Sequence, residues 1–132
     1  MSRTLVVDAS VVVDVLARFH PLPLEELLWA SDTVLAAPEL IDVEVLNALR
    51  KLDQSGAIPA SRAADLPTLM RGLRIRKYRH DILLDGIWAL RKNVTAYDAA
   101  YVTLAHLLNA TLVTRDVRLA KAPGLKIKVM TP

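Results

Sequence analysis

The sequence predicts an α/β fold, a three-layer α/β/α sandwich around a central parallel sheet of about five strands. Short apolar runs rich in Val, Leu and Ile alternate with longer segments of helical periodicity. No hairpin turn signal joins one apolar run to the next. Parallel strands joined through helices are covered on both faces by right-handed crossovers. The 132 residues suffice for one core, and we expect a single domain over residues 1–132.

The first half of the chain carries signals for two strands and three helices. A β-branched apolar run stops at Asp8, and Asp8 or Ser10 can cap the helix that follows. Pro23 occupies an acceptable first-turn position of a second helix. From Ile41 apolar residues recur at helical spacing. Gly56 then suits the left-handed backbone conformation that commonly ends a helix. We expect strands at 3–7 and 33–36 and helices at 10–16, 22–31 and 39–55.

The second half predicts three more strands, separated by helices. A helix follows Pro59, and apolar residues then alternate with Arg and Lys between Leu73 and Tyr78. A short apolar run from Thr111 is typical of a buried strand. We expect strands at 73–78, 111–114 and 126–130 and helices at 60–70, 82–91, 96–108 and 117–121.

The composition excludes several classes of protein. Without cysteine there is no disulfide framework, thiolate metal site or cysteine nucleophile, so any metal must be held by oxygen or imidazole. Charged residues interrupt the apolar stretches well before the roughly 18 residues that a membrane span needs. No export signal is visible, so we expect a soluble cytoplasmic protein. The net charge of +3 only mildly favours a polyanionic partner.

Four acidic residues are candidates for a functional site. Asp8 and Asp116 each follow a predicted strand, and ligands of open parallel sheets bind beyond the carboxyl ends of the strands. If these two strands are neighbours, both carboxylates lie on the same rim. Glu44 lies about 60° from Ile41 around its helix, and Asp98 likewise borders the buried face of its helix. Both occur near helix starts, so the four can converge where helix N-termini add positive potential.

Such a group of carboxylates predicts a divalent cation. Like charges raise one another's pKa and resist joint ionisation, and a cation removes that cost. An all-oxygen ligand set suits Mg²⁺ or Mn²⁺. The fitting reaction is phosphodiester hydrolysis, in which the ion acidifies a water and neutralises developing charge. Each acid also has a simpler interpretation, because Thr95 with Asp98 forms a capping box, Asp116 or Thr114 can cap the last helix, and Glu44 can be a solvated acid.

The motifs around these acids resemble the PIN domain, specifically the VapC-like toxins of prokaryotic toxin–antitoxin pairs. The resemblance covers essentially the whole chain in order and spacing. It rests on Val6-Val7-Asp8-Ala9-Ser10, Glu39-Leu40 through Glu44, Asn47-Ala48-Leu49-Arg50, Thr95-Ala96-Tyr97-Asp98-Ala99-Ala100-Tyr101 and Leu112-Val113-Thr114-Arg115-Asp116.

The resemblance implies a Mg²⁺- or Mn²⁺-dependent endoribonuclease that cuts structured RNA such as tRNA or ribosomal RNA and so slows translation. It implies a homodimer silenced by a cognate antitoxin. The family's four metal ligands map by motif onto Asp8, Glu44, Asp98 and Asp116, and its supporting polar residues onto Ser10, Asn47, Thr95 and Thr114.

Other residues have weaker functional interpretations. A basic segment at 71–80 can follow an RNA backbone through Arg74, Arg76 and Lys77, or it can protect an edge strand from aggregation. Arg115 contacts phosphate or is simply solvated. The aromatic residues Trp29, Trp88, Tyr97 and Tyr101 are interpreted as packing in the core or at a dimer interface.

Several alternative functions are weighed against this interpretation. An aspartyl phosphatase needs a second acid two residues after Asp8, where this chain has Ser10, and a receiver domain needs a late lysine at a strand end, whereas Lys121 follows a helix. A regulatory module could use the acids to hold a structural cation. Among nucleases, an enzyme of RNA maturation or a DNA nuclease is a further alternative.

Overall fold

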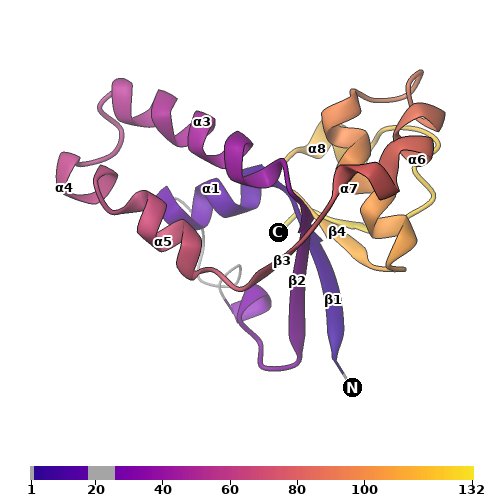
Figure 1. The fold of residues 1–132 in the computed structure, drawn as a ribbon, viewed down its shortest axis with the longest axis horizontal. Helices are drawn as coiled ribbons and strands as arrows, with labels where there is room; N and C mark the ends of the chain where they lie inside the picture. Colours follow the sequence, from indigo (N-terminus) through magenta and orange to yellow (C-terminus); the bar gives the residue numbers. More distant parts are fainter. Residues whose placement is uncertain (1, 18–25) are drawn as a thin grey trace.

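The computed structural model describes residues 2–17 and 26–132 (Figure 1). Five strands lie within these residues: β1 (Arg3–Val7), β2 (Thr33–Pro38), β3 (Ile75–Tyr78), β4 (Thr111–Val113) and β5 (Val129–Met130). The helices are α1 (Ala9–Ala17), α3 (Ile41–Gln54), α4 (Ala60–Ala63), α5 (Leu66–Gly72), the 3-10 turn η1 (His80–Leu83), α6 (Leu84–Ala89), α7 (Ala96–Leu107) and α8 (Val117–Ala120).

The strands form one parallel sheet in the order β3-β2-β1-β4-β5, which confirms the predicted fold class. β1 lies in the centre, where Leu5 is level with Leu35 of β2 and Val6 is level with Leu112 of β4. Leu5, Val6 and Val7 are at most 1% exposed, as expected for a strand covered on both faces. The carboxyl ends of β1 and β4 therefore meet on one rim.

Helices cover both faces of the sheet. In Figure 1, α1, α3 and α5 lie to one side of the strands and α6 and α7 to the other. α7 contacts β1, β2 and β4 directly, and α1 contacts α3 and α5. α7 is the most deeply buried helix, because every residue from Ala99 to Ala105 is buried. Within the described residues, no helix is both long and apolar enough to cross a membrane.

Several predicted boundaries are wrong. The expected helix 60–70 is divided into α4 and α5, because Pro67 belongs to a first helical turn and starts a new helix. The expected helix 82–91 opens with the turn η1 and ends earlier, at Ala89. The last strand is only Val129–Met130, because Lys126 has a φ of 55°, which extended strands do not accommodate.

Two further predictions concern helix ends. Gly56 follows the C-cap residue Ser55 of α3 and has a φ of 80°, so the left-handed conformation at the end of this helix is confirmed. The first part of the expected helix 22–31 lies outside the described residues. Its last part differs from the prediction, because helix extends only to Leu28 and a turn follows at Trp29.

Candidate active site

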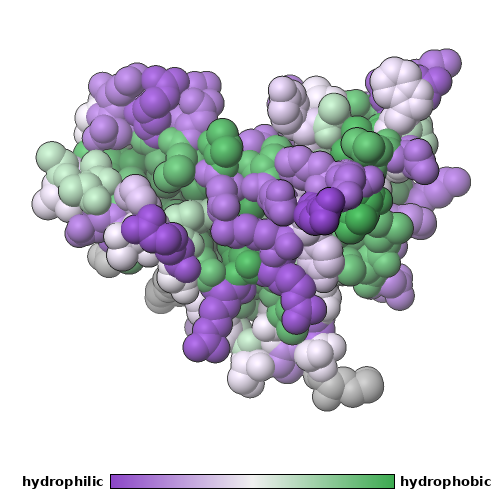
Figure 2. Space-filling model, in the orientation of Figure 1, coloured by the Kyte–Doolittle hydropathy of each residue, from purple (hydrophilic) through white to green (hydrophobic). Residues whose placement is uncertain are grey.

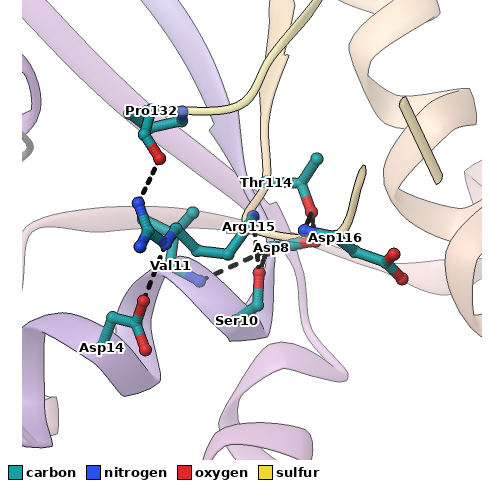
Figure 3. A network of polar contacts seen from close by, with 8 residues as sticks. All are labelled: Asp8, Ser10, Val11, Asp14, Thr114, Arg115, Asp116 and Pro132. Atoms are coloured by element: carbon teal, nitrogen blue, oxygen red, sulfur yellow. Dashed lines mark hydrogen bonds and ion pairs between the residues drawn. The ribbon is translucent and has the colours of Figure 1, made fainter. Parts of the chain in front are cut away.

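Asp8 and Asp116 lie on the same rim of the sheet, at the ends of the neighbouring strands β1 and β4 (Figure 3). The Asp8 N–H donates to the carbonyl of Val113 over 3.2 Å, which extends the pairing of the two strands to the acid itself. Asp116 comes three residues after Val113 and directly precedes α8. The neighbouring strands on which the sequence argument depended are therefore present.

Asp8 is buried, with 7% of its surface exposed, and three donors surround its carboxylate. The Ser10 hydroxyl donates to Oδ1 over 2.5 Å, the Val11 N–H donates to Oδ1 over 3.3 Å, and the Thr114 hydroxyl donates to Oδ2. Burial raises the pKa of Asp8 above its usual value, these hydrogen bonds oppose that rise, and the charge of Asp98 adds to it. The site thus holds a buried acid whose charged form depends on its hydrogen-bond donors.

Ser10 and Thr114 also join Asp8 to the loop between β4 and α8. The Ser10 hydroxyl accepts from the Arg115 N–H over 2.9 Å, and the Thr114 hydroxyl accepts from the Asp116 N–H over 3.0 Å. Each hydroxyl therefore donates to Asp8 and accepts from the backbone of this loop. The structure brings both of these predicted supporting residues against Asp8.

Glu44 reaches the site from α3 and meets a tyrosine of α7. The Tyr101 hydroxyl donates to Glu44 Oε1 over 2.6 Å. Burial raises the pKa of Glu44, and the charges of Asp98 and Asp8 raise it further, against the effect of the Tyr101 hydrogen bond. Burial and the adjacent Glu44 raise the pKa of Tyr101 far above its usual value, so its hydroxyl stays protonated.

Tyr101 is the site residue that sequence reasoning missed. Its ring is 2% exposed, as the core interpretation predicted, yet its hydroxyl contacts a candidate ligand. The available signal was that buried tyrosines usually pair their hydroxyl. Trp29, Trp88 and Tyr97 are 50%, 67% and 68% exposed, so the core interpretation is wrong for these three and a dimer interface remains a prediction for them.

The capping interpretations are confirmed for Thr95 and Asp116. The Thr95 hydroxyl accepts from the Asp98 N–H over 3.1 Å at the start of α7. Asp116 Oδ1 accepts from the N–H groups of Arg118, over 2.9 Å, and Leu119, over 3.4 Å, at the start of α8. These caps fix Asp98 at the start of α7 and Asp116 at the start of α8. Capping is therefore compatible with a place for both acids in the site.

Charge repulsion links all four acids. Burial is the main cause that raises the pKa of Asp98, and the charge of Asp116 adds to it while Arg118 opposes it. Asp98 also acts on Asp8 and Glu44. Among the residues the structure describes, no three His, Asp or Glu side chains are already arranged closely enough to hold an ion. The donor set nevertheless fits Mg²⁺ or Mn²⁺ in its chemistry, because it is all carboxylate and carries repulsion that a cation relieves.

Asn47 and Arg115, two further predicted site residues, both have partners within the protein. Asn47 accepts from Arg50 over 3.3 Å and lines a groove between α1 and α3 together with Glu44. Arg115 is not freely solvated, because its Nε pairs with Asp14 over 2.8 Å and its Nη1 donates to the carbonyl of Pro132 (Figure 3). A phosphate contact of Arg115 stays a prediction.

β3 is an edge strand, as one interpretation of the basic segment required. Arg74, which precedes it, and Arg76 within it are exposed. Lys77 is engaged by Asp42 of α3, with Nζ and Oδ1 separated by 2.7 Å. Of the three cations, Arg74 and Arg76 are therefore the better placed for an RNA contact.

Comparison with known proteins identifies similar chains over nearly the full length. The family model described as the PIN domain matches residues 5–125. Ribonuclease VapC1 of Mycobacterium tuberculosis is 41% identical over 127 residues, which cover 94% of each chain. The crystal structure of PAE2754 from Pyrobaculum aerophilum superposes with a TM-score of 0.64 at 27% identity, covering 98% of this chain and 90% of that one. VapBC2 from Rickettsia felis, crystallised with a DNA fragment from its promoter, gives a TM-score of 0.68 at 14% identity over 96% and 97% of the two chains.

Proposed function

The chain belongs to the PIN-domain family, and on this premise we propose that it is an endoribonuclease toxin of the VapC type. Its substrate is structured RNA such as tRNA or ribosomal RNA, and the consequence of cleavage is slower translation in the cytoplasm. The observation that carries the proposal is that Asp8 and Asp116 follow the neighbouring strands β1 and β4, while Glu44 and Asp98 lie close enough to be linked to them by like-charge repulsion. A relative named as a ribonuclease and 41% identical supports the choice of RNA.

The proposed ligands of a Mg²⁺ or Mn²⁺ ion are Asp8, Glu44, Asp98 and Asp116. When bound, such an ion neutralises charge on the scissile phosphate and lowers the pKa of a water. Repulsion among the acids, which opposes their joint ionisation without a cation, favours its binding.

The protein's own groups orient these acids before substrate arrives. Ser10 and Thr114 hold both oxygens of Asp8, so this carboxylate cannot rotate away from the rim. Thr95 caps α7 and fixes the turn that carries Asp98. The positive end of the α7 dipole lies at the same point, and it attracts phosphate as well as carboxylate. The exposed Arg74 and Arg76 are proposed to contact the RNA backbone.

A cognate antitoxin and a second copy of the chain are the proposed protein partners. The likeness to a toxin–antitoxin complex from Klebsiella pneumoniae, with a TM-score of 0.64, supports a fold suited to such assembly. Figure 2 shows apolar surface on the left and on the right of the molecule, with a polar region between the two. Exposed apolar side chains include Val43 and Leu46 of α3, Ile82 of η1, and Leu84 and Trp88 of α6. These residues supply surface that a protein partner can cover.

An RNA cleavage assay tests the proposed activity. Purified protein and its Asp8→Asn variant are incubated with total cellular RNA in Mg²⁺, in Mn²⁺ and in excess EDTA, and new 5′ ends are mapped. Asp53→Asn is a matched control, because Asp53 is exposed near the end of α3. We expect discrete cuts with the unmodified chain and with the control, and none with Asp8→Asn or in EDTA.

Other outcomes of the cleavage assay distinguish the toxin from the alternative functions. Absence of cuts from folded, antitoxin-free, metal-loaded protein would contradict the proposed nuclease and leave the acids a structural or regulatory role. Cuts confined to precursor RNA would indicate an enzyme of RNA maturation instead of a toxin.

A further inference from the structure

The bond between Tyr101 and Glu44 joins two helices that are remote in sequence. The donor lies on α7 and the acceptor on α3, 57 residues apart, with 2.6 Å between the hydroxyl and Oε1. The two partners differ in freedom. Tyr101 is 2% exposed, whereas Glu44 is only half-buried on a helix whose outer face meets solvent. The buried tyrosine therefore determines the position of the less buried glutamate.

Core packing fixes the Tyr101 ring. The ring belongs to the same buried cluster as Val45 of α3 and Leu104 of α7. Protein interiors are close-packed, so a ring in this position has little room to rotate. Its hydroxyl is consequently presented at a fixed point on the boundary between the core and the acids. A hydroxyl fixed in this way is a directional donor toward the site.

Glu44 needs such a restraint because its neighbours repel it. Asp8 and Asp98 both act on Glu44 with like charge. A long side chain near the surface escapes such repulsion by turning into solvent, where its charge is also better hydrated. The short bond from Tyr101 opposes this movement through Oε1 alone. Restraint of Oε1 also limits the movement of Oε2, the second oxygen of the same carboxylate.

We propose that Tyr101 is a positioning residue of the active site, which holds Glu44 beside Asp8 and Asp98 and so prepares Oε2 to bind the divalent cation. This inference rests on the proposed function and deepens it. It assigns to a core tyrosine a role outside the four acids, Ser10 and the threonine hydroxyls. It also explains why a tyrosine, with a ring for the core and a hydroxyl for the rim, occupies this position instead of phenylalanine.

The test removes only the hydroxyl. Tyr101→Phe keeps the ring in the core, and Tyr97→Phe makes the same change at a 68% exposed position of the same helix. Mn²⁺ binding to the RNA-free protein is measured by isothermal titration calorimetry, and the melting temperature is measured without metal. Loss of a group that orients a metal ligand typically weakens metal affinity by about 10- to 100-fold. We expect that loss for Tyr101→Phe and an unchanged affinity for Tyr97→Phe.

A double variant shows whether the hydroxyl acts through Glu44. In a Glu44→Gln background, Tyr101→Phe should weaken Mn²⁺ binding no further, because the carboxylate that the hydroxyl holds is already absent. Additive losses would overturn the proposal. So would a Tyr101→Phe variant that melts earlier yet binds Mn²⁺ normally, since that is the behaviour of a purely structural bond.

The controls distinguish failure of this inference from failure of the proposed function. If the unmodified protein binds Mn²⁺ and Glu44→Gln binds it more weakly, normal binding by Tyr101→Phe overturns the role of Tyr101 alone. If the unmodified protein binds no Mn²⁺, or if Glu44→Gln binds it equally well, the metal site itself is refuted and the positioning role with it.

Discussion

The substitution Thr114→Val tests whether hydroxyl donors keep Asp8 charged inside the protein. Valine has nearly the shape of threonine, and Thr114 is fully buried at 0% exposure, so the change removes a hydroxyl without opening a cavity. Two hydrogen bonds are lost. Asp8 Oδ2 loses its donor, and the Asp116 N–H, 3.0 Å from the hydroxyl, loses its acceptor.

The expected magnitude follows from these two bonds. A hydrogen bond to a charged group contributes about 1.5 to 3 kcal/mol and a neutral one about 1 kcal/mol. The free energy of unfolding should therefore fall by about 2.5 to 4 kcal/mol near neutral pH. For a chain of this length that corresponds to a melting temperature lower by roughly 10 °C.

The loss should depend on pH, with a definite sign. Burial already raises the pKa of Asp8 above 3.8, and the Thr114 hydrogen bond is one of the groups that lower it. Its removal raises the pKa further. Between the unfolded pKa and the higher folded pKa, the folded state binds more protons, so stability falls as pH rises through this window. Relative to the unmodified protein, the variant is fully destabilised above its own folded pKa of Asp8. This destabilisation is relieved as pH falls below that pKa, toward the usual value of 3.8.

Urea unfolding, followed by tryptophan fluorescence in metal-free buffer near neutral pH and again at mildly acidic pH, measures both effects. Thr111→Val makes the same change at the other end of β4 and is the matched control. We expect Thr114→Val to lose much more stability at neutral pH than at acidic pH, and the control to lose little at either. An equal loss at both pH values would refute the reasoning, because it would mean that the hydroxyl does not support a charged Asp8.

Three further predictions concern the surroundings of the site. Asp14→Ala and Arg115→Ala should each lower stability, and their double variant should show a coupling of about 1 kcal/mol in urea unfolding, since they form a 2.8 Å half-buried pair; additive losses would contradict this. Gly86→Ala should lower stability by about 1 to 3 kcal/mol, because its Cβ would lie 2.3 Å from Thr103 Cγ2, and Thr103→Ala should restore most of the melting temperature. Millimolar Mn²⁺ should raise the melting temperature of the unmodified protein and leave that of Asp8→Asn unchanged, whereas equal shifts would count against Asp8 as a ligand.

The rim of the site was predictable because it depends on topology. Once β1 and β4 are parallel neighbours, Asp8 and Asp116 must leave the sheet at the same edge. Helical spacing alone placed Glu44 and Asp98 at the borders of buried faces. These inferences need only the directions of elements, which hydrophobic periodicity determines well.

The contact between Tyr101 and Glu44 was not predictable in the same way. It depends on the distance between α3 and α7, and this distance is set by tertiary packing, since α3 contacts α1 and α7 contacts the sheet. Hydrophobic periodicity predicts the helix face on which a residue lies. It does not predict which atom of another helix the end of its side chain will contact. The engagement of Arg115 by Asp14 has the same origin, since it joins the β4–α8 loop to α1 across the site.

Capping and metal binding are compatible roles for Asp116, because a carboxylate has two oxygens. Oδ1 accepts the N–H groups at the start of α8, and this fixes the plane of the group and the position of Oδ2. At Asp8, by contrast, donors reach both oxygens, so a cation would share these oxygens with Ser10 and Thr114. Carboxylate oxygens have more than one acceptor direction, so sharing is chemically allowed. The hydrogen bonds that support folding would therefore also orient these acids for the proposed cation.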